Sequence, residues 1–196
     1  MTHPLHPMKN THHHSLIRYL NDIVAMERDV VNAVRTQLED DRVKNHPELK
    51  GLFLDLAVHG DHRADMFEKL VEKEGGTIGG VIKEGIASLT GILAGLYGIA
   101  RQHPLSHMVR DNTVAMNMAS ASYGMLLTVA MALGHRRCEE LAISALEDCP
   151  KFIMRLTDLL PRVVVEELIG DATVPYPTAA AEAQELIRRA WEKTEV

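Results

Sequence analysis

The stretch that decides the fold is residues 16–41, which read LIRYLNDIVAMERDVVNAVRTQLEDD. Its apolar side chains recur at steps of three and four, which is the spacing of one face of an α-helix. They are Leu16, Leu20, Ile23, Val24, Val30, Val31, Val34 and Leu38. The spacing predicts a long amphipathic helix whose apolar face packs against other helices.

A second long helix is predicted over residues 48–73, where the same periodicity continues. Pro47 can begin it, because the first turn of a helix needs no backbone N–H from that residue. Gly75 follows its last turn, and glycine is a typical stop signal for a helix.

A third helix is predicted over residues 105–134, and its composition is unusual. Between Asp111 and His135 the chain has no Asp, Glu, Lys, Arg or His. A helix that is apolar on all sides is buried in a core or lies in a membrane. Because the amides of Asn112 and Asn117 would be costly in lipid, the buried position is favoured.

A fourth helix is predicted over residues 136–160. Proline removes a backbone hydrogen bond inside a helix, so we expect a kink at Pro150 and a break at Pro161. A turn rich in Pro and Tyr then leads to a short last helix, for which Thr178 is a plausible N-cap.

The segment 79–100 joins the second and third helices and is rich in glycine. From Gly85 to Ala100 its only ionisable side chain is that of Tyr97. We expect an apolar helical insert that lies against the bundle, and its length allows the chain to cross the bundle rather than turn tightly.

These segments predict an all-α protein built as a four-helix bundle, with no βαβ alternation. The expected organisation is a disordered His-rich arm over residues 1–15, the bundle over 16–170, and a C-terminal turn and helix over 171–196.

Composition excludes several classes of protein. With 46% hydrophobic and 24% charged residues among 196, the chain is neither disordered nor fibrous. A net charge of −6 argues against general nucleic-acid binding, which depends on neutralising phosphates. The two cysteines, Cys138 and Cys149, give no disulfide framework and suit a reducing, cytoplasmic location.

Glu27 is the first candidate functional residue, because it lies on the apolar face of the first helix. A carboxylate in that position is costly unless it is paired or binds a metal ion. Both readings remain open at this point: a ligand of a metal ion, or an ion pair with an Arg or His.

His59 and His62 form the second candidate. They are three residues apart on the second helix, and His59 replaces an apolar residue on its buried face. Two imidazoles at this spacing can converge on one ion, together with a carboxylate partner such as Glu27.

The layout resembles the ferritin-like superfamily, and particularly its small bacterial members related to stress proteins. The resemblance covers residues 16–168 and rests on the helix that ends in Met26–Glu27, on the run LAVHGDH at 56–62, and on SYGML at 122–126. Such proteins carry a di-iron or di-manganese site, with one Glu from each of two helices and Glu-x-x-His from each of the other two.

Carried over residue by residue, the resemblance implies an incomplete ligand set. Glu27 matches the carboxylate of the first helix, and His62 matches the histidine of the second. His59 and Ala119 stand where glutamates are expected. On the fourth helix Asp148, or its neighbour Glu147, could take the place of the carboxylate.

Two functions of different kinds follow. One is a structural, stress-related homo-oligomer, expected to be a dimer, whose metal site is degenerate and in which no catalytic residue is predicted. The other is a mononuclear protein that binds iron, manganese or zinc through Glu27, His59, His62 and Asp148. A membrane-associated helical protein is a further alternative, although the partner that we expect is a second copy of the chain rather than a membrane.

Overall fold

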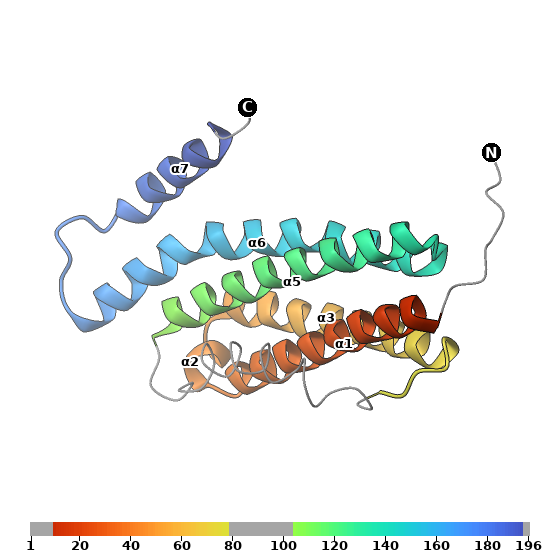
Figure 1. Ribbon diagram of the computed structural model, residues 1–196. Helices are drawn as coiled ribbons and strands as arrows, with labels where there is room; N and C mark the ends of the chain where they lie inside the picture. The colour runs from red at the N-terminus through yellow and green to blue at the C-terminus, as the bar shows by residue number, and fades with distance from the viewer. Residues whose placement is uncertain (1–9, 79–103, 194–196) are drawn as a thin grey trace.

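The computed structural model describes residues 10–78 and 104–193, and within these ranges it contains helices and no strand. The helices are α1 (Asn10–Leu38), α2 (Asp41–Lys44), α3 (Pro47–Lys73), α5 (Leu105–Leu133), α6 (Arg136–Asp171) and α7 (Ala179–Glu192). The four long helices α1, α3, α5 and α6 lie side by side in one bundle (Figure 1). The predicted all-α bundle is confirmed.

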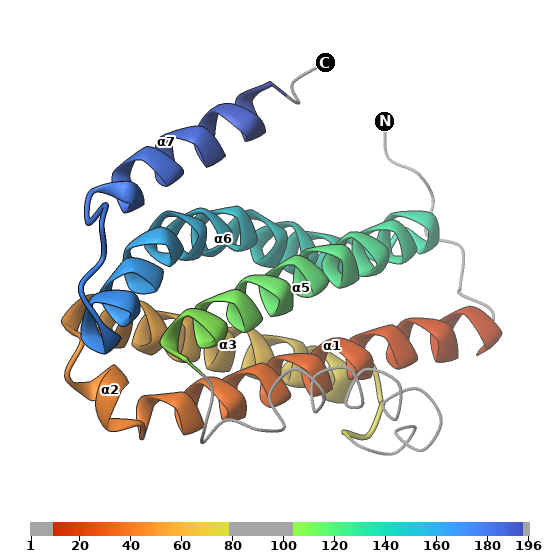
Figure 2. The same ribbon diagram turned by 90° about the vertical axis from the view of Figure 1, so that its left-hand side faces the viewer.

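The bundle consists of two antiparallel hairpins. The short helix α2 lies in the connection between α1 and α3, whereas α5 and α6 are joined by a tight turn at Gly134 (Figure 2). Gly134 ends α5 in the left-handed conformation, with φ 66°, which a residue with a side chain rarely adopts. The two hairpins pack mainly through α1 and α5.

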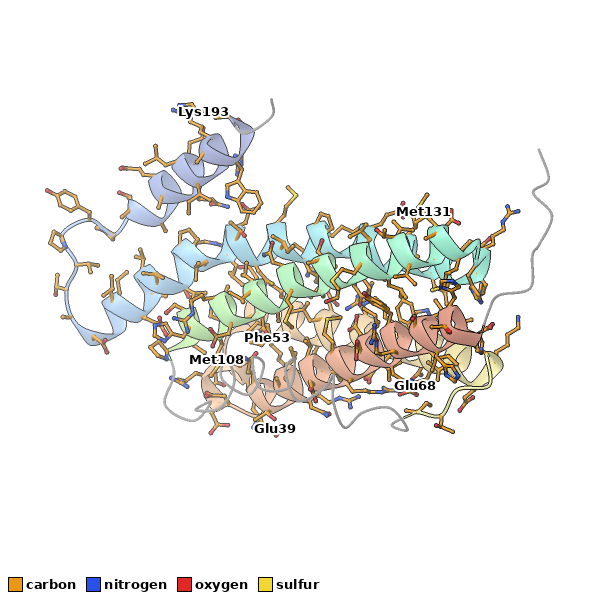
Figure 3. The ribbon with its side chains drawn as sticks, in the orientation of Figure 1. Glu39, Phe53, Glu68, Met108, Met131 and Lys193 are labelled. Carbon is orange, nitrogen blue, oxygen red and sulfur yellow. The ribbon has the colours of Figure 1, made fainter. Side chains whose placement is uncertain are left out.

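The core is formed by the apolar stripes that the sequence predicts. Seven of the eight stripe residues of α1 are buried, and Leu38 packs against the core from its edge. Large side chains such as Phe53 of α3 and Met108 of α5 point into the interior (Figure 3). The burial of these stripes provides the main force that holds the helices together.

Charged residues fix α1 against α3 outside the core. The guanidinium of Arg28 binds three carboxylates of α3, at 3.0 Å to Asp61, 2.6 Å to Asp65 and 2.9 Å to Glu68. Because these carboxylates lie at successive turns of α3, they fix the register of the two helices.

Two histidines connect α3 and α6 at opposite ends of the bundle. The Nδ1 atom of His46 accepts a backbone N–H from the first turn of α3, and its Nε2 lies 3.0 Å from Glu166 of α6. The Nδ1 atom of His135 caps α6 in the same way, and its Nε2 lies 3.2 Å from Glu74 at the end of α3. Each histidine therefore begins one helix and contacts the end region of the other.

Two expected boundaries were wrong. Helix α1 begins at Asn10, inside the arm expected at residues 1–15, and His13 donates a hydrogen bond of 2.8 Å to the carbonyl oxygen of Glu74. Helix α6 continues through Pro161 to Asp171. Pro161 cannot donate a backbone hydrogen bond, but it is buried, as are Leu159 and Val163 beside it. Packing of this apolar stripe stabilises the helix where that hydrogen bond is lost.

The remaining expectations concern the two ends of the chain and the insert. The rest of the arm, at residues 1–9, and the predicted insert at residues 79–100 lie outside the described residues. The predicted last helix is α7, which follows Thr178 and lies over α6 with no fully buried residue (Figure 2). Among the described helices, α5 alone is long and apolar enough to cross a membrane, a test that core helices also pass.

Candidate functional site

A buried ion pair lies in the interior of the bundle. Glu27 of α1 is 1% exposed, and Arg63 of α3 is 6% exposed. The Nε atom of Arg63 donates to Oε1 of Glu27 at 2.7 Å, and Nη2 donates to Oε2 at 3.2 Å. This two-point contact matches the planar guanidinium to the planar carboxylate, which is the strongest geometry for such a pair.

The other two long helices complete this site. The Nε atom of Arg63 also donates to the hydroxyl of Tyr123 on α5, at 3.1 Å, and its Nη1 lies 3.7 Å from Oδ2 of Asp148 on α6. We call Glu27, Arg63, Tyr123 and Asp148 the polar centre. Each of the four long helices contributes one residue to it.

Gly60 makes room for the polar centre. It lies one turn before Arg63 on α3 and faces α1. A Cβ atom at this position would lie 3.2 Å from Oε2 of Glu27 and 2.6 Å from a methyl carbon of Val31. The missing side chain therefore allows α1 and α3 to approach each other where the ion pair forms.

Burial and pairing act in opposite directions on the two charges. Burial raises the pKa of Glu27, and the nearby charge and hydrogen bonds of Arg63 oppose this rise. Burial also acts to lower the pKa of Arg63, but the charge and hydrogen bonds of Glu27, with a smaller contribution from Asp148, act in the opposite direction, and the pKa of Arg63 is raised. Either charge without the other would be an isolated ion in an apolar interior.

Asp148 lies at the outer edge of the polar centre. Its Oδ1 accepts a hydrogen bond of 3.0 Å from Lys151, and its Oδ2 lies 3.5 Å from Nδ1 of His59. Partial burial acts to raise the pKa of Asp148, but Lys151, His59 and Arg63 together lower it below its ordinary value. Asp148 therefore remains an anion at neutral pH.

The histidines predicted as metal ligands lie on the surface. The side chain of His59 is half exposed and packs edge-on against Phe152, with the ring centres 5.3 Å apart. His62 is exposed, and no described contact links it to Glu27 or Asp148. The structure thus gathers Glu27 and Asp148 around Arg63, with His59 at the rim and His62 outside.

This arrangement does not fit a metal ion. Within residues 10–78 and 104–193, no three His, Cys, Asp or Glu side chains are close enough to hold one. A metal ion would need the lone pairs of Glu27, and the guanidinium of Arg63 already occupies both of its oxygens. The positive charge that Glu27 requires is supplied by the chain itself.

The cysteines do not provide nucleophiles. Burial raises the pKa of both Cys138 and Cys149 to about 12. Both are therefore protonated thiols at neutral pH, and a thiol is a poor nucleophile compared with a thiolate.

Sequence reasoning identified Glu27 but did not identify its partner. Arg63 lies on the apolar stripe of α3, where a charge is as costly as on α1. The criterion that singled out Glu27, a charged residue on the apolar face of a predicted helix, therefore applies to Arg63 as well. Tyr123 gave a weaker signal: a buried tyrosine hydroxyl in a helix without charges needs a polar partner.

The comparisons with known proteins agree with this fold. The family model described as "Domain of unknown function (DUF892)" matches residues 11–169. No curated protein matches the chain.

A solved structure shares the architecture. The chain is similar to the crystal structure of the Escherichia coli stress protein YciF, with a TM-score of 0.66 and 20% sequence identity. The match covers 80% of this chain and 98% of that one. At this identity the likeness concerns the fold alone.

Proposed function

Since the chain belongs to the family of unknown function DUF892, whose family model spans the whole bundle, we propose a structural role built on its polar centre. The protein is a ferritin-like bundle in which the ion pair of Glu27 and Arg63 takes the place of a metal centre. It acts as a homo-oligomer in a stress-related role and is not a metal-dependent enzyme.

The observation that carries this proposal is the two-point contact between Arg63 and Glu27, at 2.7 and 3.2 Å. In ferritin-like di-metal proteins, inward carboxylates and histidines from all four helices surround the ions. Here all four helices also meet at one place, but the cation between them is a guanidinium. An arginine remains charged throughout the physiological pH range, so it neutralises Glu27 without any metal supply.

Oxygen activation at a ferritin-like centre needs a metal ion with open coordination positions. The polar centre offers a closed ion pair and a tyrosine hydroxyl instead. We therefore assign the polar centre to the stability and helix register of the bundle. The stress-related part of the proposal draws on the likeness to the Escherichia coli stress protein YciF, which shares the fold.

The experiment is aerobic loading of the full-length protein with Fe(II), followed by oxygen consumption and by bound iron after desalting. The matched control is the double variant Glu27→Leu with Arg63→Leu. It removes the buried carboxylate that would bind a metal ion, and it retains every histidine of the N-terminal segment. We expect equal iron binding and equal oxygen consumption in both proteins.

One or two equivalents of iron bound by the wild type alone, with oxygen consumed, would overturn the proposal. Iron bound equally by both proteins would be assigned to the histidines outside the polar centre.

A further inference from the structure

A cavity lies between α6 and α7, where α7 passes over the bundle (Figure 2). Its volume is about 330 Å³. Sites for small molecules measure about 300–1,000 Å³, so the cavity has room for a small ligand. No residue of the polar centre belongs to its lining, which includes Met154 and Asp158 of α6 and Ile187, Arg188, Trp191 and Glu192 of α7.

The apolar side chains of this cavity are incompletely covered. Trp191 of α7 is 57% exposed and Met154 of α6 is 62% exposed, although both line the same cavity. An indole ring provides a large apolar area, and a helix that only covered the bundle would bury that ring against α6. The cavity therefore retains apolar surface, including an aromatic ring, that a ligand can cover.

The bundle itself does not depend on α7. The family model ends at residue 169, before this helix begins. Among the described residues, the core and the apolar side chains packed against it come from the other helices, and α7 has no buried residue. Helix α7 is thus free to serve a role other than folding, and the cavity is the feature that it creates.

The arginines of α6 near the cavity already have carboxylate partners on α3. Arg155 contacts Asp55 at 2.8 Å, and Arg162 contacts Glu48 at 2.5 Å. Asp158 lies between these arginines in the sequence and acts on Arg162 as a more distant charge. Within the described part of the chain Asp158 forms no ion pair, so its carboxylate lines the cavity without a bound counter-charge.

The charges that α7 brings to the cavity are of both signs. Arg188 lies 3.4 Å from Glu185, which also binds Arg189 at 2.8 Å. Glu192 forms no ion pair with the residues that the structure describes. The lining therefore has two carboxylates, those of Asp158 and Glu192, against one guanidinium that already has a partner.

We propose that this cavity binds a small organic cation with an apolar body, of the alkylammonium class. The face of an aromatic ring attracts a cation, and tryptophan does so most strongly, so the cationic head lies against Trp191. Asp158 and Glu192 balance its charge, while Met154 and Ile187 pack against its apolar part. The site is independent of the polar centre and of the number of copies in the assembly.

Charge distinguishes the cation from two other occupants of the same size. An anionic ligand would place its charge beside Asp158 and Glu192, and Arg188 already has a carboxylate partner. A neutral apolar ligand would remove water from the two carboxylates without supplying a counter-charge, which is costly. The cation avoids both penalties.

The first experiment titrates the full-length protein with three probes that share one alkyl chain: octyltrimethylammonium, octanol and octanoate. Trp191 is the only tryptophan of the chain, so a change in tryptophan fluorescence reports on this cavity alone. We expect the emission to shift to shorter wavelength as the ligand covers the indole. The cation should bind about 10-fold more tightly than either of the other probes.

The second experiment removes the charge and the ring separately. Asp158→Asn should weaken binding of octyltrimethylammonium about 3-fold or more and leave binding of octanol unchanged. The matched control is Asp171→Asn, on the same helix but outside the cavity, which should bind as the wild type does.

The contribution of the ring is measured by calorimetry, because these variants lose the fluorescent reporter. Trp191→Leu should weaken binding of the cation about 3- to 10-fold, and Trp191→Phe, which retains an aromatic face, should weaken it less. Circular dichroism verifies that the variants are folded.

Several results would overturn the inference. Octanol bound as tightly as the cation would show an apolar cavity that does not recognise charge, and tighter binding of octanoate would assign the cavity to an anion. No binding of the three probes at millimolar concentration would show that the cavity is not a ligand site. None of these results affects the proposed function, because the experiments change no residue of the polar centre.

Discussion

At the scale of single residues, the interior of this bundle contains a cation that the chain supplies itself. Arg63 reaches Glu27 with two hydrogen bonds and Tyr123 with one, while Asp148 lies 3.7 Å from its remaining nitrogen. Gly60 leaves the space in which this contact forms. Three kinds of substitution measure the contributions separately.

Removing one partner of the buried pair should destabilise the protein strongly. Arg63→Leu leaves the carboxylate of Glu27 buried without a counter-charge, so we expect a loss of about 3–5 kcal/mol in the free energy of unfolding. Glu27→Leu should cost a similar amount, and the double variant should recover most of the loss. Urea unfolding of the four proteins measures the coupling, and additive losses would contradict a direct pair.

A methyl group at position 60 should disturb the centre. Because the new Cβ would lie 2.6 Å from a carbon of Val31, we expect Gly60→Ala to lower the free energy of unfolding by about 1–3 kcal/mol. Gly51→Ala is the matched control on the same helix, where a Cβ would meet no atom within 4 Å. That change should stabilise the protein by about 0.5–1 kcal/mol, as alanine does in a helix. Equal effects at both positions would argue against the close approach.

The contribution of Asp148 should depend on pH. Its pKa is lower in the folded protein than its ordinary value of 3.8, so its stabilising effect is present above pH 3.8 and is lost as the pH falls through the folded pKa. We expect Asp148→Asn to cost about 0.5–1 kcal/mol at pH 7. In urea titrations this difference should shrink toward pH 3, and a constant difference would show that the charge is not its cause.

At the scale of helices, the sequence predicts the stripes well and the ends poorly. The burial of Leu16 and Leu20 follows from periodicity alone, because one apolar face must be covered. The end of α6 depends on the burial of Leu159 and Val163 against other helices, which no local signal at Pro161 reveals. The position of Glu27 on an apolar face is local information, so the sequence predicts that it needs a partner. Its pairing with Arg63 depends on how α1 and α3 pack against each other, which the sequence of either helix alone does not give.

The histidine caps give a prediction at this scale. His135→Ala removes both the cap of α6 and the contact with Glu74, and we expect a loss of about 1 kcal/mol or more. His135→Asn removes the contact with Glu74 but retains a side chain that caps helices well, so it should cost less. Thermal unfolding of the two variants compares them, and equal losses would mean that the cap contributes nothing.

At the scale of the whole molecule, two features together describe the proposed role. The polar centre joins the four helices from within, and the exposed face of α5 carries no charge between residues 112 and 134. Neither feature needs a metal ion or a substrate. The account therefore predicts an assembly whose mass is that of protein alone.

Native mass spectrometry of the full-length protein tests this claim most directly, because one spectrum reports both the number of copies and any bound metal. The account predicts a dimer of about 43.6 kDa, which is twice the chain mass of 21.8 kDa. It also predicts that the polar centre binds no metal ion, so the wild type and the double variant Glu27→Leu with Arg63→Leu should show the same metal content. A metal adduct that is present in the wild type and lost in the double variant would contradict it.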